Sequence, residues 1–124
     1  MRYGTVIDRD GLTIVHEKIL TAVGRNRRVL EVGCSTGYLS LEMKERLNCE
    51  VVGVEADPEA ADKARARCKK IIVGNIENPE TLRNITGKYD TIILADVLEH
   101  LVNPLKVLTA LVHFLDSGGY VVIS

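Results

Sequence analysis

The sequence has few aromatic residues, few cysteines and no long apolar run. It contains no tryptophan and one phenylalanine, which leaves few rings on which the bases of single-stranded nucleic acid could stack. Cys34, Cys49 and Cys68 lack the paired spacing of a zinc ribbon or a disulfide framework, so we expect reduced thiols and a cytoplasmic protein. Nothing resembles a signal peptide, because Asp8 and Asp10 interrupt the N-terminal segment, and we expect no membrane association.

The overall composition is that of a globular domain. Of the 124 residues, 46% are hydrophobic and 27% are charged, and the formal net charge is −1. This excludes a surface that is basic throughout. The cations of one segment are spaced around a helix rather than along one side, so we expect a solvated face and no nucleic-acid partner. They are Lys63, Arg65, Arg67, Lys69 and Lys70.

Five short aliphatic runs recur about every 20 to 30 residues, a spacing that leaves room for a crossover helix between them. They begin at Val29, Val51, Ile71, Ile92 and Val121. Continuous aliphatic runs, without alternating polar residues, are typical of strands that are covered on both faces. The runs therefore predict a parallel sheet.

The segments between the runs have the spacing of helices. An apolar stripe passes through Leu39 and Met43, and another begins at Leu105 and continues through Val112. Residues 12–23 predict a further helix before the first strand, and residues 117–119, Ser-Gly-Gly, predict a turn after the last helix.

All three prolines mark the start of a predicted helix. Pro58, Pro79 and Pro104 each follow an Asp or Asn. Such a residue can cap the first turn, and proline at the first helical position loses no helical hydrogen bond.

A helix followed by alternating strands and helices predicts an α/β fold, a Rossmann-like, doubly wound parallel sheet in three layers, α/β/α. We treat residues 1–124 as one domain, and since the sequence stops at Ser124, beside the fifth predicted strand, we expect it to be part of a longer polypeptide. Ligands of such sheets bind at the carboxyl ends of the strands. The chemistry should therefore lie where the aliphatic runs end.

A glycine-bearing turn follows the first run. Gly33 and Gly37 flank Ser35, so the segment lacks the G-x-G-x-x-G pattern of dinucleotide-binding proteins. Such a turn lets a ligand approach backbone amides at the start of a helix, although it can also be an ordinary tight connection.

Polar residues also follow the second and third runs. Glu55 lies where an acid can accept hydrogen bonds from both hydroxyls of a ribose, whereas Asp57 is better explained as a helix cap. Asn75 or Glu77 could face the edge of a purine. Alternatively, Asn75 shapes the turn and Glu77 lies in solvent.

Three polar side chains follow the fourth run. If residues 96–100 form a helical turn, Asp96 lies on the same side as Glu99 and His100. Such a trio could hold a divalent ion, supply a base or form a structural network.

These features jointly resemble the class I S-adenosylmethionine-dependent methyltransferases from Arg28 to Ser124. Residues 31–37, Glu-x-Gly-x-Ser-x-Gly, are similar to that family's cofactor loop, and Glu55 matches its ribose-binding acid. Asn75 matches the polar residue that lies near the adenine amine in that family. The stretch at 96–101, Asp-Val-Leu-Glu-His-Leu, matches the family's segment after the fourth strand, and residues 117–120 are similar to its turn before the fifth strand.

The resemblance implies S-adenosylmethionine as cofactor, S-adenosylhomocysteine as product, and Asp96 and His100 as candidate catalytic residues. The implied cofactor-binding residues are Glu31, Gly33, Cys34, Ser35, Gly37, Tyr38, Glu55, Ala56, Asn75, Ile76 and Asp96. Asp96, Glu99 and His100 also resemble the metal-holding stretch of small-RNA 2′-O-methyltransferases and a related stretch in ubiquinone-pathway enzymes. A later metal-binding histidine would also be expected, and since His113 fits a solvent-facing position better, we assign no metal.

Two substitutions depart from the family pattern. Ser35 replaces a glycine, which crowds the cofactor if that position needs a positive φ, and Asn75 replaces an aspartate, which removes a charge. Both predict weaker cofactor binding. The sixth and seventh strands of the family are missing, so the fifth strand should form an exposed edge, through which we expect a homodimer.

The expected function is methyl transfer to an oxygen or nitrogen of a small-molecule or sugar-type acceptor. A nicotinamide-dependent oxidoreductase is the alternative enzyme class, because it shares the fold and the acid after the second strand. A non-catalytic module that binds the cofactor or serves in assembly is the other alternative.

Overall fold

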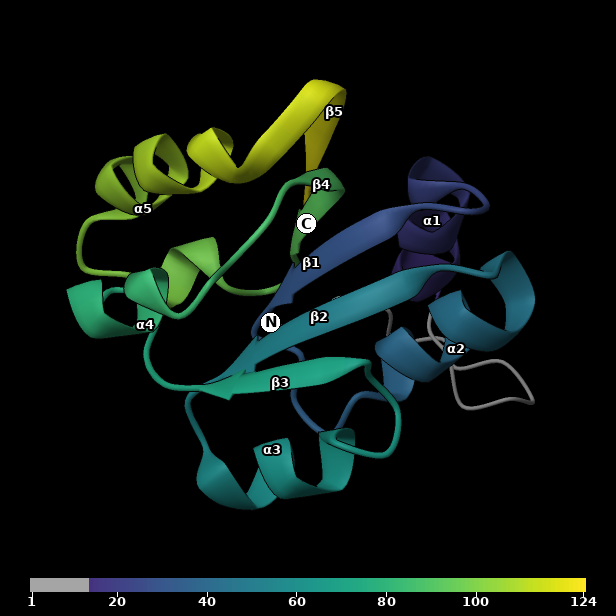
Figure 1. The fold of residues 1–124 in the computed structure, drawn as a ribbon, viewed down its shortest axis with the longest axis horizontal. Coiled ribbons are helices and arrows are strands. Elements are labelled where there is room, and N and C mark those ends of the chain that lie inside the picture. Colours follow the sequence, from purple (N-terminus) through teal and green to yellow (C-terminus); the bar gives the residue numbers. More distant parts are fainter. Residues whose placement is uncertain (1–13) are drawn as a thin grey trace.

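The computed structural model describes residues 14–124, whose five strands form a parallel sheet with helices on both faces (Figure 1). The strand order is β3-β2-β1-β4-β5, and every neighbouring pair is parallel. The strands are β1 Arg28–Val32, β2 Glu50–Glu55, β3 Lys70–Val73, β4 Tyr89–Leu94 and β5 Leu115–Ile123. The predicted doubly wound architecture is confirmed.

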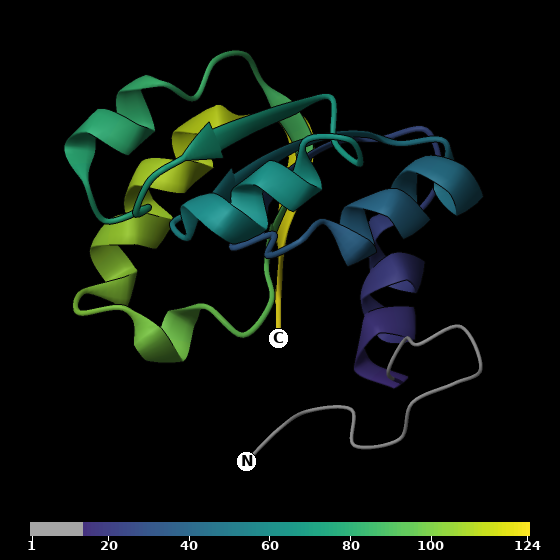
Figure 2. The ribbon, with the colours of Figure 1, turned by 90° about the horizontal axis from the view of Figure 1, so that it is seen from below.

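The helices divide between the two faces of the sheet (Figures 1 and 2). They are α1 Ile14–Val23, α2 Tyr38–Leu47, α3 Pro58–Ala64, α4 Pro79–Arg83 and α5 Pro104–Leu111, with short 3₁₀ turns η1 Leu98–His100 and η2 Val112–Phe114. Helices α1, α2 and α3 pack on one face, and α4 and α5 pack on the other. Residues 12 and 13 of the first predicted helix lie outside the described residues.

The predicted proline-marked helix starts are confirmed. The side chains of Asp57, Asn78 and Asn103 each accept a hydrogen bond from a backbone N–H of the first turn, at 2.9–3.3 Å. In each case the next residue is the proline that opens α3, α4 or α5. The caps satisfy amide groups that the helix leaves unpaired.

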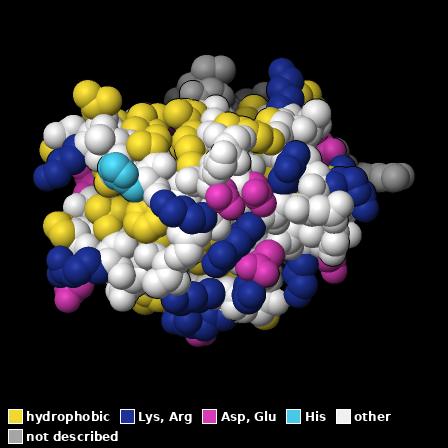
Figure 3. All heavy atoms as spheres, turned by 45° about the horizontal axis from the view of Figure 1, so that its top comes forward, with side chains coloured by type: hydrophobic (Ala, Val, Ile, Leu, Met, Phe, Trp, Pro, Cys, Tyr) yellow, Lys and Arg dark blue, Asp and Glu magenta, His cyan; other side chains and the backbone are white. Residues whose placement is uncertain are grey.

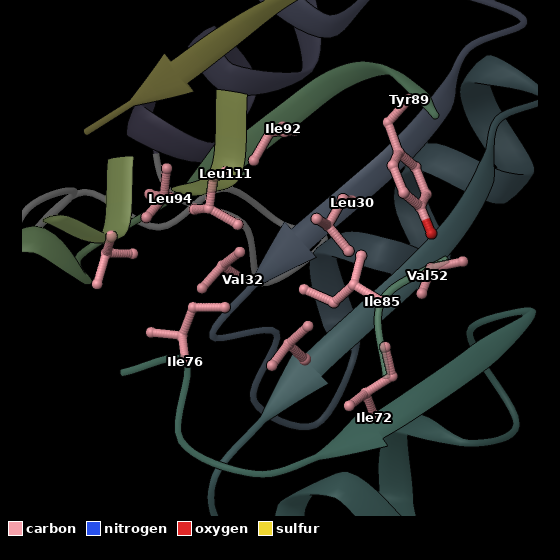
Figure 4. Close-up of a cluster of buried hydrophobic side chains, with 12 residues drawn as sticks. Leu30, Val32, Val52, Ile72, Ile76, Ile85, Tyr89, Ile92, Leu94 and Leu111 are labelled. Carbon is pink, nitrogen blue, oxygen red and sulfur yellow. The ribbon is translucent and has the colours of Figure 1, made fainter. Parts of the chain in front are cut away.

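Successive strand residues enter cores on opposite faces of the sheet, as the pleat requires. Val29 packs with α1 and α2, whereas Leu30 belongs to the larger core beneath α4 and α5. Figure 4 shows this larger core, in which Leu111 of α5 lies over the aliphatic side chains of the sheet. Covering both faces explains why aliphatic residues dominate the inner strands.

The predicted apolar stripe of the last helix is only partly correct. Leu105 is 72% exposed and Val112 is 46% exposed, whereas Val107 and Leu111 are buried. Helix α5 ends at Leu111 and gives way to η2, so the buried face does not follow one continuous helical stripe.

The predicted turn at residues 117–119 is wrong, because this segment is a bulge within β5. Asp90 alone lies opposite residues 116–119 in the pairing of β4 with β5. Gly118 has φ 80°, and a Cβ on Gly119 would lie 2.9–3.1 Å from backbone carbonyl oxygens. The glycines therefore serve a strand irregularity, where the chain passes close to neighbouring backbone.

The basic segment after α3 does not form one helical face. Helix α3 ends at Ala64, so only Lys63 lies in it, and Lys70 already begins β3. Arg67 donates to the Thr36 carbonyl oxygen at 3.2 Å. On the face drawn in Figure 3, Lys and Arg side chains lie among Asp and Glu side chains.

No helix within residues 14–124 has the length and apolar character needed to cross a membrane.

Candidate active site

A cavity of about 230 Å³ lies at the carboxyl ends of β1, β2, β3 and β4. It lies beside β1, which has β2 on one side and β4 on the other, at the point where the strand order reverses. The predicted site residues that line it are Gly33, Glu55, Ala56, Asn75, Ile76, Asp96 and His100. The lining does not include the predicted residues Glu31, Cys34, Ser35, Gly37, Tyr38 and Glu99.

The turn after β1 adopts left-handed backbone at three alternate residues. Gly33, Ser35 and Gly37 have φ values of 74°, 55° and 82°. A Cβ on Gly33 would lie 2.7 Å from Cγ2 of Val97, so this position has no room for a side chain. Ser35 occupies the conformation that favours glycine, at a cost of about 1–2 kcal/mol.

Glu55 holds this turn from the end of β2. Its Oε1 accepts a hydrogen bond from the Ser35 N–H at 2.7 Å, and its Oε2 accepts one from the Asp57 N–H at 2.9 Å. A carboxylate offers about four lone-pair positions. Glu55 therefore keeps acceptor capacity on both oxygens at the edge of the cavity.

Asn75 and Glu77 order the loop after β3. The side-chain oxygen of Asn75 accepts from the Glu77 N–H at 2.9 Å, so Asn75 shapes the turn as well as lining the cavity. The Glu77 carboxylate accepts from the N–H groups of Val102 and Asn103 at 3.0 and 3.1 Å. The alternative that Glu77 merely lies in solvent is therefore wrong, because it fastens the segment that leads into α5.

The segment after β4 differs from the helical turn considered for residues 96–100. Only Leu98–His100 forms a 3₁₀ turn, and Asp96 precedes it with φ 56°. The Asp96 N–H donates to the Ser124 carbonyl oxygen at 3.2 Å. Within residues 14–124, no three His, Cys, Asp or Glu side chains gather in a way that could hold a metal ion.

Glu31 lies in β1, below the turn. It is 3% exposed, and the Ser40 hydroxyl of α2 donates to its Oε1 at 2.5 Å. Burial raises the pKa of Glu31 to about 8, although the Ser40 hydrogen bond opposes the shift. Glu31 is thus a buried, largely protonated acid at neutral pH.

Cys34 also supports the turn from inside. Its side chain is 1% exposed and packs with Ala61 and Ala64 of α3. A hydrogen bond with the Cys68 thiol and burial both raise the pKa of Cys34. It is therefore a packing residue in the thiol form.

His16 was not predicted as a site residue. It lies in α1, and its Nε2 is 3.5 Å from the hydroxyl of Tyr38, with the two ring centroids 5.2 Å apart. Burial lowers the pKa of His16, and the negative charges of Asp96 and Glu17 oppose that shift. No motif marks this contact in the sequence, because only the packing of α1 against α2 brings His16 against Tyr38.

Comparison with known proteins identifies what the chain is similar to. A family model described as "Methyltransferase domain" matches residues 10–124. The ubiquinone biosynthesis O-methyltransferase of Shewanella pealeana is 32% identical over 102 residues, which cover 79% of this chain and 43% of that protein. The enzyme of the same name from Cereibacter sphaeroides strain ATCC 17025 is 34% identical over 100 residues, which cover 78% and 40%. The chain thus spans less than half the length of these relatives.

Solved structures show the same fold at lower identity. The plantazolicin methyltransferase BamL, crystallised with a triazolic desmethylPZN analog and S-adenosylhomocysteine, matches with a TM-score of 0.71 and 23% identity, over 83% of this chain and 42% of that one. A TehB-like S-adenosylmethionine-dependent methyltransferase from Corynebacterium glutamicum matches with a TM-score of 0.70 and 21% identity, over 87% and 59%.

Proposed function

The chain belongs to the family of methyltransferase domains, and from this premise we propose that it binds S-adenosylmethionine and transfers its methyl group to a small-molecule acceptor. The family membership favours methyl transfer over the nicotinamide-dependent oxidation that the fold also allows. The observation that carries the proposal is the Glu55 carboxylate, held at the edge of the cavity by two backbone N–H groups.

Glu55 suits the ribose of the cofactor. One lone-pair position on each of its oxygens is taken by the Ser35 and Asp57 N–H groups, and the remaining positions can accept the two ribose hydroxyls. The two backbone bonds fix the carboxylate before the ligand arrives, so binding orders few side-chain torsions.

The other lining residues fit the two ends of such a ligand. Asn75 and Ile76 lie after β3, where we place the adenine, and Gly33 lines the cavity where we place the ribose. A cavity of 230 Å³ is smaller than the roughly 300–1,000 Å³ of common ligand sites, so we expect it to hold the nucleoside part. The amino-acid part would then follow residues 34–38 and Ala56, with Glu31 supporting this turn from below.

The chemistry needs little from the protein beyond orientation. The positively charged sulfur supplies the leaving group, so the chain has to position the acceptor and exclude water. A hydroxyl or amine acceptor also loses a proton. Asp96 and His100 line the cavity and remain the predicted catalytic residues, because a carboxylate or neutral imidazole can accept that proton.

The names of the relatives favour an oxygen acceptor. The relatives described above are O-methyltransferases named for ubiquinone biosynthesis. Since the chain spans less than half of each, we propose only the coarser class, a small molecule with a nucleophilic hydroxyl.

Calorimetric titration with S-adenosylhomocysteine tests the cofactor assignment, with NAD as control ligand. We expect saturable binding of S-adenosylhomocysteine alone. The variant Glu55→Ala should weaken this binding, because it removes the carboxylate at the edge of the cavity. Glu80→Ala, which removes an exposed acid on α4, is the matched control and should bind as the unchanged chain does. Binding of NAD alone, or of neither ligand, would contradict the proposal.

We also propose that two copies associate through β5. Within residues 14–124 this strand pairs with β4 alone and its other edge is open, and Tyr120 and Ile123 are 39% and 49% exposed. Open strand edges pair readily with other strands. Sedimentation velocity at rising protein concentration should show a dimer, and a monomer at the highest concentration would refute the assembly.

A further inference from the structure

A second cavity, of about 290 Å³, lies at the amino ends of the strands, on the opposite edge of the sheet from the proposed cofactor site. Arg28, Lys70 and Tyr89 line it, and they are the first residues of β1, β3 and β4. The buried side chains of Val52, Ile72 and Tyr89 form its floor, and Figure 4 shows the hydroxyl end of Tyr89 beside Val52. The base of this cavity is therefore largely apolar.

Three cations surround this floor. Lys69 and Lys70 are exposed at the start of β3, and Arg28 comes from β1, on the other side of β2. Among residues 14–124, no carboxylate lines the cavity. Glu50 contacts two of the cations from outside the lining, at 3.4 Å from Nε of Arg28 and 3.0 Å from Nζ of Lys69. One negative charge thus faces three positive ones.

The Arg28 guanidinium is fixed in place at the cavity wall. Its Cζ lies 4.8 Å from the centroid of the Tyr89 ring. A Cβ on Gly87 would lie 2.8 and 2.9 Å from its two terminal nitrogens, so glycine at this position leaves the room that the guanidinium occupies. Asp90 lies nearby, but its carboxylate accepts the backbone N–H of Arg28 at 2.8 Å and does not line the cavity.

One donor of this guanidinium has nothing to bond. The Nε of Arg28 is buried and has no hydrogen-bond partner among the described residues. Leaving a buried donor unsatisfied costs free energy, and native structures contain few such groups. A guanidinium binds phosphate through two parallel N–H groups, so an anion that bonds Nε and a terminal nitrogen together would satisfy it.

We propose that this second cavity binds a small organic phosphate. The phosphate would lie among Arg28, Lys69 and Lys70, and the apolar body of the ligand would lie over Val52 and Ile72. A phosphate monoester carries about two negative charges at neutral pH, which match the two positive charges that Glu50 leaves unbalanced. The two cavities share no residue, so this site is independent of the proposed function.

Calorimetric titration with phenyl phosphate tests the site, with inorganic phosphate and benzyl alcohol for comparison. We expect phenyl phosphate to bind most tightly, because inorganic phosphate lacks the apolar body and benzyl alcohol lacks the charge. Saturating S-adenosylhomocysteine should change the affinity for phenyl phosphate by less than about twofold, since distant sites act additively. The first titration needs no bound cofactor, so it remains valid if the proposed function fails.

Three variants locate the binding. Arg28→Gln should weaken phenyl phosphate by about tenfold or more, because hydrogen bonds to charged groups are the strong ones. Lys70→Gln should weaken it by about threefold, as expected for an exposed charge, and it tests the site even if Arg28→Gln fails to fold. Lys63→Gln makes the same change at an exposed cation of α3, outside the cavity, and should leave the affinity unchanged.

The opposite results would overturn the proposal. Absence of saturation by phenyl phosphate at about 10 mM would remove the site. Equal weakening by Lys63→Gln and Lys70→Gln would show general attraction to a charged surface, and no change with Lys70→Gln or Arg28→Gln would place the ligand elsewhere. Competition with S-adenosylhomocysteine would place phenyl phosphate in the cofactor site. The proposed function stands in each case, because it fails only if the unchanged chain does not bind S-adenosylhomocysteine.

Discussion

Replacing Glu31 with glutamine should make the protein less sensitive to alkaline pH. Glu31 is fully buried, and its pKa in the folded protein is about 8, against 4.5 for the exposed side chain. Between these values the unfolded chain is ionised while the folded chain keeps the proton, so folding becomes less favourable as pH rises. Below pH 4.5 Glu31 does not lower the stability of the folded protein, and above pH 8 nearly all of its destabilising effect is present.

The size of the effect follows from the two pKa values. Because of Glu31, the free energy of unfolding should fall by about 3 kcal/mol between pH 5 and pH 8, since one pKa unit corresponds to about 1.4 kcal/mol. Glutamine does not titrate and can still accept the hydrogen bond from the Ser40 hydroxyl. The fixed cost of burying its amide is the same at both pH values, and it cancels when the two are compared.

The assay is urea unfolding of both proteins at pH 5 and pH 8. We compare the free energy of unfolding of Glu31→Gln with that of the unchanged chain at each pH. This difference should favour the variant by about 3 kcal/mol more at pH 8 than at pH 5. Glu80→Gln, at an exposed position, should show no such difference between the two pH values. If Glu31→Gln has the same effect at both, the folded protein carries Glu31 as a carboxylate and the reasoning from burial is wrong.

Three other substitutions test the turn, the ribose acid and a cap. Glu55→Ala should weaken S-adenosylhomocysteine by about 1.5–3 kcal/mol in calorimetry, because it removes an ionised acceptor, and unchanged affinity would remove Glu55 from the ribose site. Gly33→Ala should lower the free energy of unfolding by about 1–3 kcal/mol, since its Cβ would meet Val97 and its φ is positive. Adding Val97→Ala should recover only the part due to the contact. Asn103→Ala should cost about 1 kcal/mol in urea unfolding through loss of the α5 cap, whereas an unchanged midpoint would mean that the cap contributes nothing.

Features governed by neighbours in the sequence were predicted correctly. The aliphatic runs became the strands, because a segment covered on both faces is mostly apolar. Asp57, Asn78 and Asn103 cap the helices they precede, because a cap acts on the next turn of the same chain. Glu55 reached the cavity because the end of a strand fixes its place at the edge of a parallel sheet.

Features that depend on distant residues were missed or only partly predicted. Glu77 bonds to the backbone at residues 102 and 103, and nothing near Glu77 in the sequence indicates that partner. The glycines at 118 and 119 look like a turn, and only their pairing beside Asp90 makes them a bulge. Likewise, the end of α5 at Leu111 changed which of its apolar residues are buried.

The sequence by itself determined the order of strands and helices, the edge of the sheet where the cavity lies and the place of Glu55 at that edge, since periodicity, caps and strand ends are local properties. Tertiary structure alone decided the protonation of Glu31, the backbone of Asp96 and the meeting of His16 with Tyr38. Each of these depends on burial or contact between segments far apart in the chain. Burial sets the protonation of a side chain such as Glu31, and tertiary contacts hold the left-handed backbone of Asp96. The same residues in another packing would therefore have different chemistry.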